Sequence, residues 1–194
     1  MIQTLYLLVF FATRLIRRFK QTILRSFREE PVFSFGVLLL IGLTVFFRFY
    51  NWTGRIYIHA DNSLFTQAAK YGVDHLLIPQ IGPFSQSTFF TGPWWLWILE
   101  VVYFLLFGIL SPWLFMSLLS VIFVGFIFLI GKEIGGRWIG LIAALLGAIS
   151  TAQIDNSFTV WNAGIDPMIS LLAIFFLRQD KFLFEMIFVY QYNQ

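Results

Sequence analysis

Long uncharged stretches alternate with short charged ones along most of this chain. After Pro31, apolar runs occupy residues 32–47, 94–110, 113–131, 138–149 (extending toward 154) and 168–177. A membrane-spanning helix needs about 20 mostly apolar residues, and charged or aromatic residues typically flank it. The pattern therefore predicts an all-α fold, an integral membrane helical bundle in which Arg48 and Trp52 follow the first run as a headgroup-level belt.

The composition excludes the two main alternatives to a membrane protein. Of the 194 residues, 59% are hydrophobic and only 12% are charged. Soluble domains average about 45–50% apolar and about 25% charged residues, and disordered chains are richer still in charge and poor in aromatics. The chain also has no cysteine, which excludes disulfides, thiolate metal sites and cysteine nucleophiles.

The basic residues gather at the N-terminal end. Residues 1–31 contain six of them against Glu29 and Glu30, namely Arg14, Arg17, Arg18, Lys20, Arg25 and Arg28. A positive flank before a span marks the cytoplasmic side, so we expect a cytoplasmic N-terminus. Apolar residues interleave with these charges, which predicts a basic amphipathic interfacial helix over residues 1–30 that contacts membrane lipids rather than nucleic acid. A signal peptide is disfavoured because the positive charge follows the apolar stretch.

The basic loops decide which apolar runs cross the membrane. If the run 94–110 crossed, the basic loop at 132–137 and the charged cluster at 178–181 would both lie outside. If that run instead lies along the outer leaflet, the loop at 132–137 and the cluster at 178–181 both lie on the cytoplasmic side, where basic loops are usually found. Glu100 within the run also suits an interface better than the lipid interior. We therefore expect a multi-pass protein of the cell (plasma) membrane with about four spans.

The four expected spans are residues 32–50, 113–131, 138–154 and 167–177. Two outer juxtamembrane helices are expected at about 62–72 and 94–110. Asp61 stands directly before the first of these helices. Two interpretations of this aspartate remain open, a helix N-cap and a surface carboxylate that accepts a proton from a hydroxyl group.

Several motifs occur in a fixed order around this aspartate. They are Asp61, Pro79, Gly82-Pro83, Ser85, Gly92-Pro93-Trp94-Trp95, Trp161-Asn162 and Asp166-Pro167. Over residues 31–180 this series resembles the N-terminal part of GT-C superfamily glycosyltransferases, in the protein mannosyltransferase-like branch that depends on polyprenyl-phosphate sugars. The resemblance implies inverting transfer of a sugar from a lipid-linked donor to an acceptor hydroxyl at the outer membrane face. The acceptor class, glycan, lipid or protein, stays open.

The resemblance also implies roles for individual residues. Asp61 would be the general base and Asp166 a second catalytic carboxylate. The implied donor-phosphate contacts are Arg55, His59 and Lys70, and the implied sugar or acceptor contacts are Trp161, Asn162 and Asn62. Structural interpretations stay open beside these, including a helix cap for Asp166 and an aromatic belt for Trp161. No cofactor is implied, and a divalent metal is left open.

Such enzymes run to several hundred residues, so we expect the chain to be the front of a longer protein. Residues 31–181 would form its membrane module, and residues 182–194 would begin an incomplete further segment. The alternatives are an inactive truncated relative and a non-catalytic membrane protein, either a transporter or an assembly subunit. A transporter is disfavoured because the expected spans lack ionisable residues at mid-membrane depth.

Overall fold

Helices dominate the described part of the chain, which confirms the expected all-α fold. The computed structural model describes residues 28–84 and 92–179, and no β-strand occurs among these residues. Nearly all of the predicted helix at 1–30 and the whole of segment 182–194 lie outside them. Contacts divide the chain into two compact units, Met1–Gly42 and Leu43–Gln194. The first unit holds the beginning of α2 (Pro31–Phe49), and the second holds its end and every later helix described.

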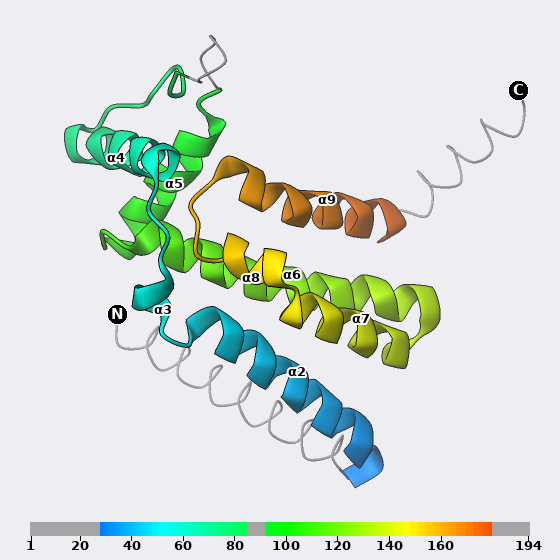
Figure 1. The fold of residues 1–194 in the computed structure, drawn as a ribbon. Helices are drawn as coiled ribbons and strands as arrows, with labels where there is room; N and C mark the ends of the chain where they lie inside the picture. The colour runs from blue at the N-terminus through cyan, green and yellow to red at the C-terminus, as the bar shows by residue number, and fades with distance from the viewer. Residues whose placement is uncertain (1–27, 85–91, 180–194) are drawn as a thin grey trace, which may run out of the picture. The chain divides into compact units, whose positions relative to one another are not determined.

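The later helices are short except for α6 and α9. They are α3 (Trp52–Arg55), α4 (Ala60–His75), α5 (Trp94–Leu106), α6 (Ser111–Gly135), α7 (Arg137–Ile149), α8 (Thr151–Asn156) and α9 (Asn162–Gln179), as drawn in Figure 1.

Two of the described helices are long and apolar enough to cross a membrane. They are α2, with 19 residues and a mean hydropathy of 2.2, and α6, with 25 residues and a mean hydropathy of 2.7. The helices α5 and α7 have 13 residues each, about 20 Å at 1.5 Å per residue, against a hydrocarbon core of about 30 Å. Each of these two is therefore too short to cross such a core by itself as a straight helix.

Helix ends differ from the expected ones where the backbone leaves helical geometry. Ser150 is extended, with φ −60° and ψ 117°, and divides the expected span 138–154 into α7 and α8. Phe107 has a left-handed conformation, with φ 53°, and ends α5 four residues before the expected residue 110. The helix α9 begins at Asn162, five residues before the expected span 167–177, and Pro167 lies inside the helix.

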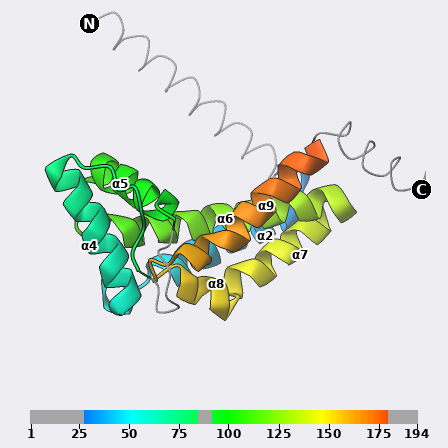
Figure 2. The same cartoon turned by 90° about the horizontal axis from the view of Figure 1, so that it is seen from above.

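The helices α6 and α7 form a tight antiparallel hairpin (Figure 1). Gly136 joins them with a positive φ of 82°, which glycine adopts without strain. Gly140 faces α6 so closely that an added Cβ would lie 2.6 Å from the carbonyl oxygen of Phe128. The helix α8 then returns along α6 toward its start, and α9 packs on α6 as well (Figure 2).

The hydrophobic core lies where α4 and α5 meet the beginning of α6 (Figure 2). Trp95 and Leu99 of α5 are almost fully buried there, against Ala69 of α4 and Trp113 of α6. Val160, from the segment between α8 and α9, joins the same core. The core thus connects α4 and α5 with the segment between α8 and α9.

Buried polar side chains satisfy the carbonyl groups at the break between α7 and α8. Arg48 is fully buried and donates hydrogen bonds from Nη1 to the carbonyl of Ala148 (2.9 Å) and from Nε to Ser120 Oγ (2.8 Å). Ser117 Oγ donates to the carbonyl of Ser157 (2.8 Å) and accepts from Trp52 Nε1 (2.8 Å). We call Arg48, Trp52, Ser117 and Ser120 the Arg48 cluster. Arg48 and Trp52 thus form hydrogen bonds within the protein. The sequence had instead predicted both side chains at the level of the lipid headgroups.

Candidate functional site

The predicted base Asp61 lies in the first turn of α4 and is exposed. The helix starts at Ala60, two residues earlier than expected, because His59 occupies the cap position and its carbonyl accepts the Ser63 N–H (3.0 Å). The N-cap interpretation of Asp61 is therefore wrong. A carboxylate in the first turn still interacts favourably with the positive end of the helix dipole, and its exposure leaves it open to a hydroxyl group.

Asn62 points the other way and is fully buried. Its Nδ2 donates a hydrogen bond to the carbonyl of Tyr57 (3.0 Å), and its Oδ1 is buried without a partner among the described residues. The side chain holds the segment before α4 against the helix. The sugar contact predicted for Asn62 stays a prediction, and the geometry gives this residue a structural role.

The structure joins the segment before α4 to the segment between α8 and α9. The backbone N–H of Tyr57 donates to the carbonyl of Phe158 (3.1 Å). The guanidinium of Arg55 lies 4.1 Å from the centre of the Phe158 ring and donates to the carbonyl of Phe47 (2.8 Å). The approach to Asp61 therefore packs directly on the chain between α8 and α9, although about 100 residues separate the two segments in sequence.

The three predicted phosphate contacts do not form one group. Arg55 and His59 lie on the segment that leads to Asp61, and the His59 ring lies 5.4 Å from that of Tyr57. Lys70 instead lies nine residues beyond Asp61 on α4, about 14 Å along the helix axis. Its Nζ forms an ion pair with Asp74 one turn away. Arg55 and His59 remain the better placed of the three.

The predicted residues of the second segment are grouped around the start of α9. Trp161 is exposed directly before the helix, and Asn162 is its first residue. Asp166 is exposed one turn later and is not the helix cap that the sequence allowed. Exposure of Trp161 and Asp166 is compatible with contact to a ligand.

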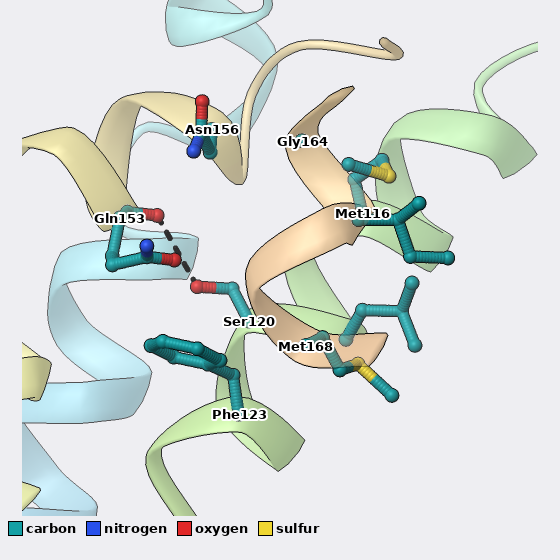
Figure 3. A pocket seen from close by; sticks show the side chains of 9 residues that line it. Met116, Ser120, Phe123, Gln153, Asn156, Gly164 and Met168 are labelled. Atoms are coloured by element: carbon teal, nitrogen blue, oxygen red, sulfur yellow. Dashed lines mark hydrogen bonds between the residues drawn. The ribbon is translucent and has the colours of Figure 1, made fainter. Parts of the chain in front are cut away.

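A small polar cavity lies behind this segment, between α6, α8 and α9 (Figure 3). Ser120, Gln153 and Asn156 line it together with Met116 and Met168. Ser120 Oγ donates to the carbonyl of Gln153 (3.3 Å), the dashed line in Figure 3. The volume of about 10 Å³ is near the minimum for one water molecule. This cavity therefore cannot accommodate a sugar.

An apolar groove of about 570 Å³ runs along α5 where this helix meets α6. Its lining side chains are Trp94, Trp97, Ile98, Val101, Val102, Leu105, Leu106 and Phe115. The groove has no charged lining residue, so it suits a hydrocarbon chain and offers nothing to bind a phosphate or a sugar.

Glu100 of α5 has surroundings that the sequence did not predict. One carboxylate oxygen, Oε1, is buried without a hydrogen-bond partner among the described residues. Burial raises the pKa of this carboxyl group above its ordinary value. The signal in the sequence was a lone acidic residue inside an apolar run, and it indicates an unusual environment without saying what lies opposite.

Comparisons with models of protein families, with curated proteins and with solved structures find no match for this chain. Within residues 28–84 and 92–179, no group of three or more histidine, aspartate or glutamate side chains could hold a metal ion. The geometry of the described residues is therefore the basis for the functional proposal.

Proposed function

We propose that this protein is a membrane glycosyltransferase that moves a sugar from a polyprenyl-phosphate donor to an acceptor hydroxyl on the outer side of the cell membrane. The observation that carries the proposal is the exposed Asp61 at the start of α4, on a segment tied to Phe158 before α9. This contact joins the candidate base to the segment that holds Trp161 and Asp166. The order of motifs along the sequence supports the same function.

In the proposed reaction Asp61 accepts the proton of the acceptor hydroxyl while that oxygen attacks the anomeric carbon. The bond from this carbon to the donor phosphate oxygen breaks, so the polyprenyl phosphate leaves with the bonding electron pair and the configuration inverts. Positive charge near the leaving phosphate stabilises it. Arg55 and His59 are the candidates for this role, and the groove along α5 suits the polyprenyl chain.

The membrane placement is part of the proposal. We infer that α2 and α6 cross the membrane, that α7 together with α8 and α9 complete about four spans, and that α4 and α5 lie at the outer interface. Supporting this placement, α5 buries Trp95 and Leu99 in the core and exposes Val101 and Phe104 on another face. Apolar side chains exposed on a short helix are favourable where lipid covers them.

The decisive experiment measures sugar transfer in membranes that contain the full gene product and a labelled polyprenyl-phosphate sugar. Asp61→Asn should abolish transfer because the amide cannot accept the proton. Asp74→Asn is the matched control, since Asp74 is a second exposed carboxylate on α4, and it should leave transfer intact. Full activity of Asp61→Asn would refute the assignment and leave the non-catalytic alternative.

A separate experiment tests the membrane placement of the helices. The sequence has no native cysteine, so a thiol reagent can label only a cysteine that is introduced. A cysteine introduced at Ser87 should react with a membrane-impermeant reagent added outside, and a cysteine at Gly135 should not. Labelling of the Gly135 cysteine from outside would show that residues 94–110 cross the membrane.

A further inference from the structure

The carboxylate of Glu100 lies where α5 meets the last turns of α4. Its Oε1 approaches Gly72 so closely that a Cβ at that position would overlap it. Any residue other than glycine at this point of α4 would displace the carboxylate. Glycine is otherwise unfavourable inside a helix, by about 1 kcal/mol relative to alanine. Gly72 thus makes room for a charged group that finds no partner there among the described residues.

The chain then turns back and forms a wall opposite Glu100. The helix α4 ends at His75, Leu76 caps it in a left-handed conformation with φ 53°, and the N–H of Leu77 donates to the carbonyl of Gly72 (2.9 Å). Further along, the carbonyl of Pro79 accepts a hydrogen bond from Trp97 Nε1 (2.9 Å). This bond fixes the returning segment to α5, so the space in front of Glu100 has three defined sides.

The resulting cavity is apolar apart from Glu100. Its volume is about 380 Å³, within the roughly 300–1,000 Å³ typical of ligand pockets. The lining side chains include Leu64, Tyr71, Leu77, Ile81 and Leu96. Among the described residues that line the cavity, Glu100 is the only charged one. We call this space the Glu100 cavity.

The chemistry of the Glu100 cavity selects its occupant. A carboxylate that lines an apolar space favours a positive charge and a hydrogen-bond donor, and the walls favour a hydrocarbon chain. A primary ammonium group on a lipid supplies all three features. A quaternary ammonium has the charge without an N–H donor, and an anionic headgroup is repelled.

We propose that the Glu100 cavity binds a membrane lipid with a primary ammonium headgroup, its ammonium on Glu100 and the start of its acyl chain against the apolar walls. The site is separate from the proposed base, because Gly72 is eleven residues beyond Asp61, about 16 Å along α4. The inference rests on the interfacial placement of α4 and α5 proposed above, and it does not depend on sugar transfer.

The test uses the full chain in vesicles that contain a photoreactive acyl-chain analogue of phosphatidylethanolamine, phosphatidylcholine or phosphatidylglycerol. Cross-links are mapped by mass spectrometry to the peptides that carry residues 64–72 and 76–83. Phosphatidylethanolamine should label these peptides about fivefold more than the other two lipids, which corresponds to about 1 kcal/mol of preference. Glu100→Gln should remove the preference. Asp74→Asn, which changes an exposed carboxylate of α4 outside the cavity, should retain it.

Gly72→Ala provides a second variant that keeps the charge. Its methyl group should displace the carboxylate and reduce the preference for phosphatidylethanolamine. Equal labelling by all three lipids in the unaltered chain, or an unchanged preference in Glu100→Gln, would overturn the proposed site while leaving the membrane placement in force. Labelling by no lipid would overturn the placement and the site together.

Discussion

Two charged side chains, Arg48 and Glu100, are withdrawn from solvent in this protein in opposite ways. Arg48 is fully buried, and its guanidinium meets Ser120 Oγ and carbonyl groups at the end of α7. Glu100 is only partly buried, yet its Oε1 meets no donor among the described residues. A buried charge with matched partners stabilises one arrangement of the chain, whereas one without them is costly unless a ligand provides the partner. The comparison distinguishes two regions. Around α6–α8 the buried charge stabilises the fold, and between α4 and α5 lies the cavity that we propose binds a lipid.

The largest effect is expected for Arg48→Met, which keeps the apolar volume and removes the donors. The carbonyls of Gly147 and Ala148 and the hydroxyl of Ser120 would lose their buried partner. At about 1–3 kcal/mol for each buried group left unpaired, we expect a loss of about 4 kcal/mol. Thermal unfolding in detergent measures it. Arg55→Met, which removes a half-buried arginine with one such bond, should lose clearly less, and equal losses would contradict the special role of Arg48.

Gly140→Ala should come next, with a loss of about 3 kcal/mol typical of overpacking. Its Cβ would meet backbone atoms of Phe128 and Lys132, which cannot move aside without opening the α6–α7 hairpin. Gly125→Ala is the matched control, because nothing lies within 4 Å of that added Cβ. Unfolding midpoints of the two variants compare them directly. A small loss for Gly140→Ala would mean that the hairpin is looser than described.

Ser120→Ala tests one member of the Arg48 cluster alone. The hydroxyl accepts from Arg48 Nε and donates to the carbonyl of Gln153. Arg48 keeps its bonds to the α7 carbonyls in this variant, so the loss should be about 1 kcal/mol. A double-mutant cycle with Arg48→Met should then show coupling, since the two side chains share a bond. Strict additivity would argue against the cluster as a unit.

Glu100→Gln should have the smallest effect on stability. It should stabilise the protein at neutral pH, whereas the three variants above destabilise it. The pKa of Glu100 is raised by burial, so the folded state favours the protonated form. Its contribution to stability is present below the pKa of the unfolded chain and is lost as pH rises through the higher folded value. At neutral pH the neutral glutamine should therefore raise stability, by on the order of 1 kcal/mol or less. Unfolding midpoints across pH 4–8 would show a weaker fall toward high pH in the variant, and an unchanged pH profile would contradict the burial of the charge.

The sequence predicted the kind of fold and missed the fine structure of its helices. Apolar periodicity and run length located the helices, because these properties follow from local composition. The break at Ser150 and the left-handed ends at Leu76 and Phe107 were not predicted, since none of these residues is a strong breaker. At Leu76 and Phe107 local backbone hydrogen bonds close the helix, from the Leu76 N–H to the carbonyl of Val73 and from the Phe107 N–H to the carbonyl of Tyr103.

The surroundings of the candidate site residues were also predictable only in part from the sequence. Asp61 and Asp166 were recognised from residue type and from neighbouring turns, and the structure exposes both. Asn62 and Lys70 were grouped with them by proximity in sequence, yet Asn62 is buried and Lys70 pairs with Asp74. Residues that are adjacent in a helix point about 100° apart, so Asn62 can face the interior while Asp61 beside it is exposed.

By itself the sequence determined that the chain is helical, that it consists largely of long apolar runs, and that few charges remain away from the N-terminus. These are properties of composition and periodicity. Only the tertiary structure decided that Arg48 stabilises the fold through buried hydrogen bonds. It also decided that Glu100 lines an apolar cavity and has one buried oxygen without a partner among the described residues. The physical reason is that a buried charge takes its role from partners on other helices, and those partners meet only when the chain has folded.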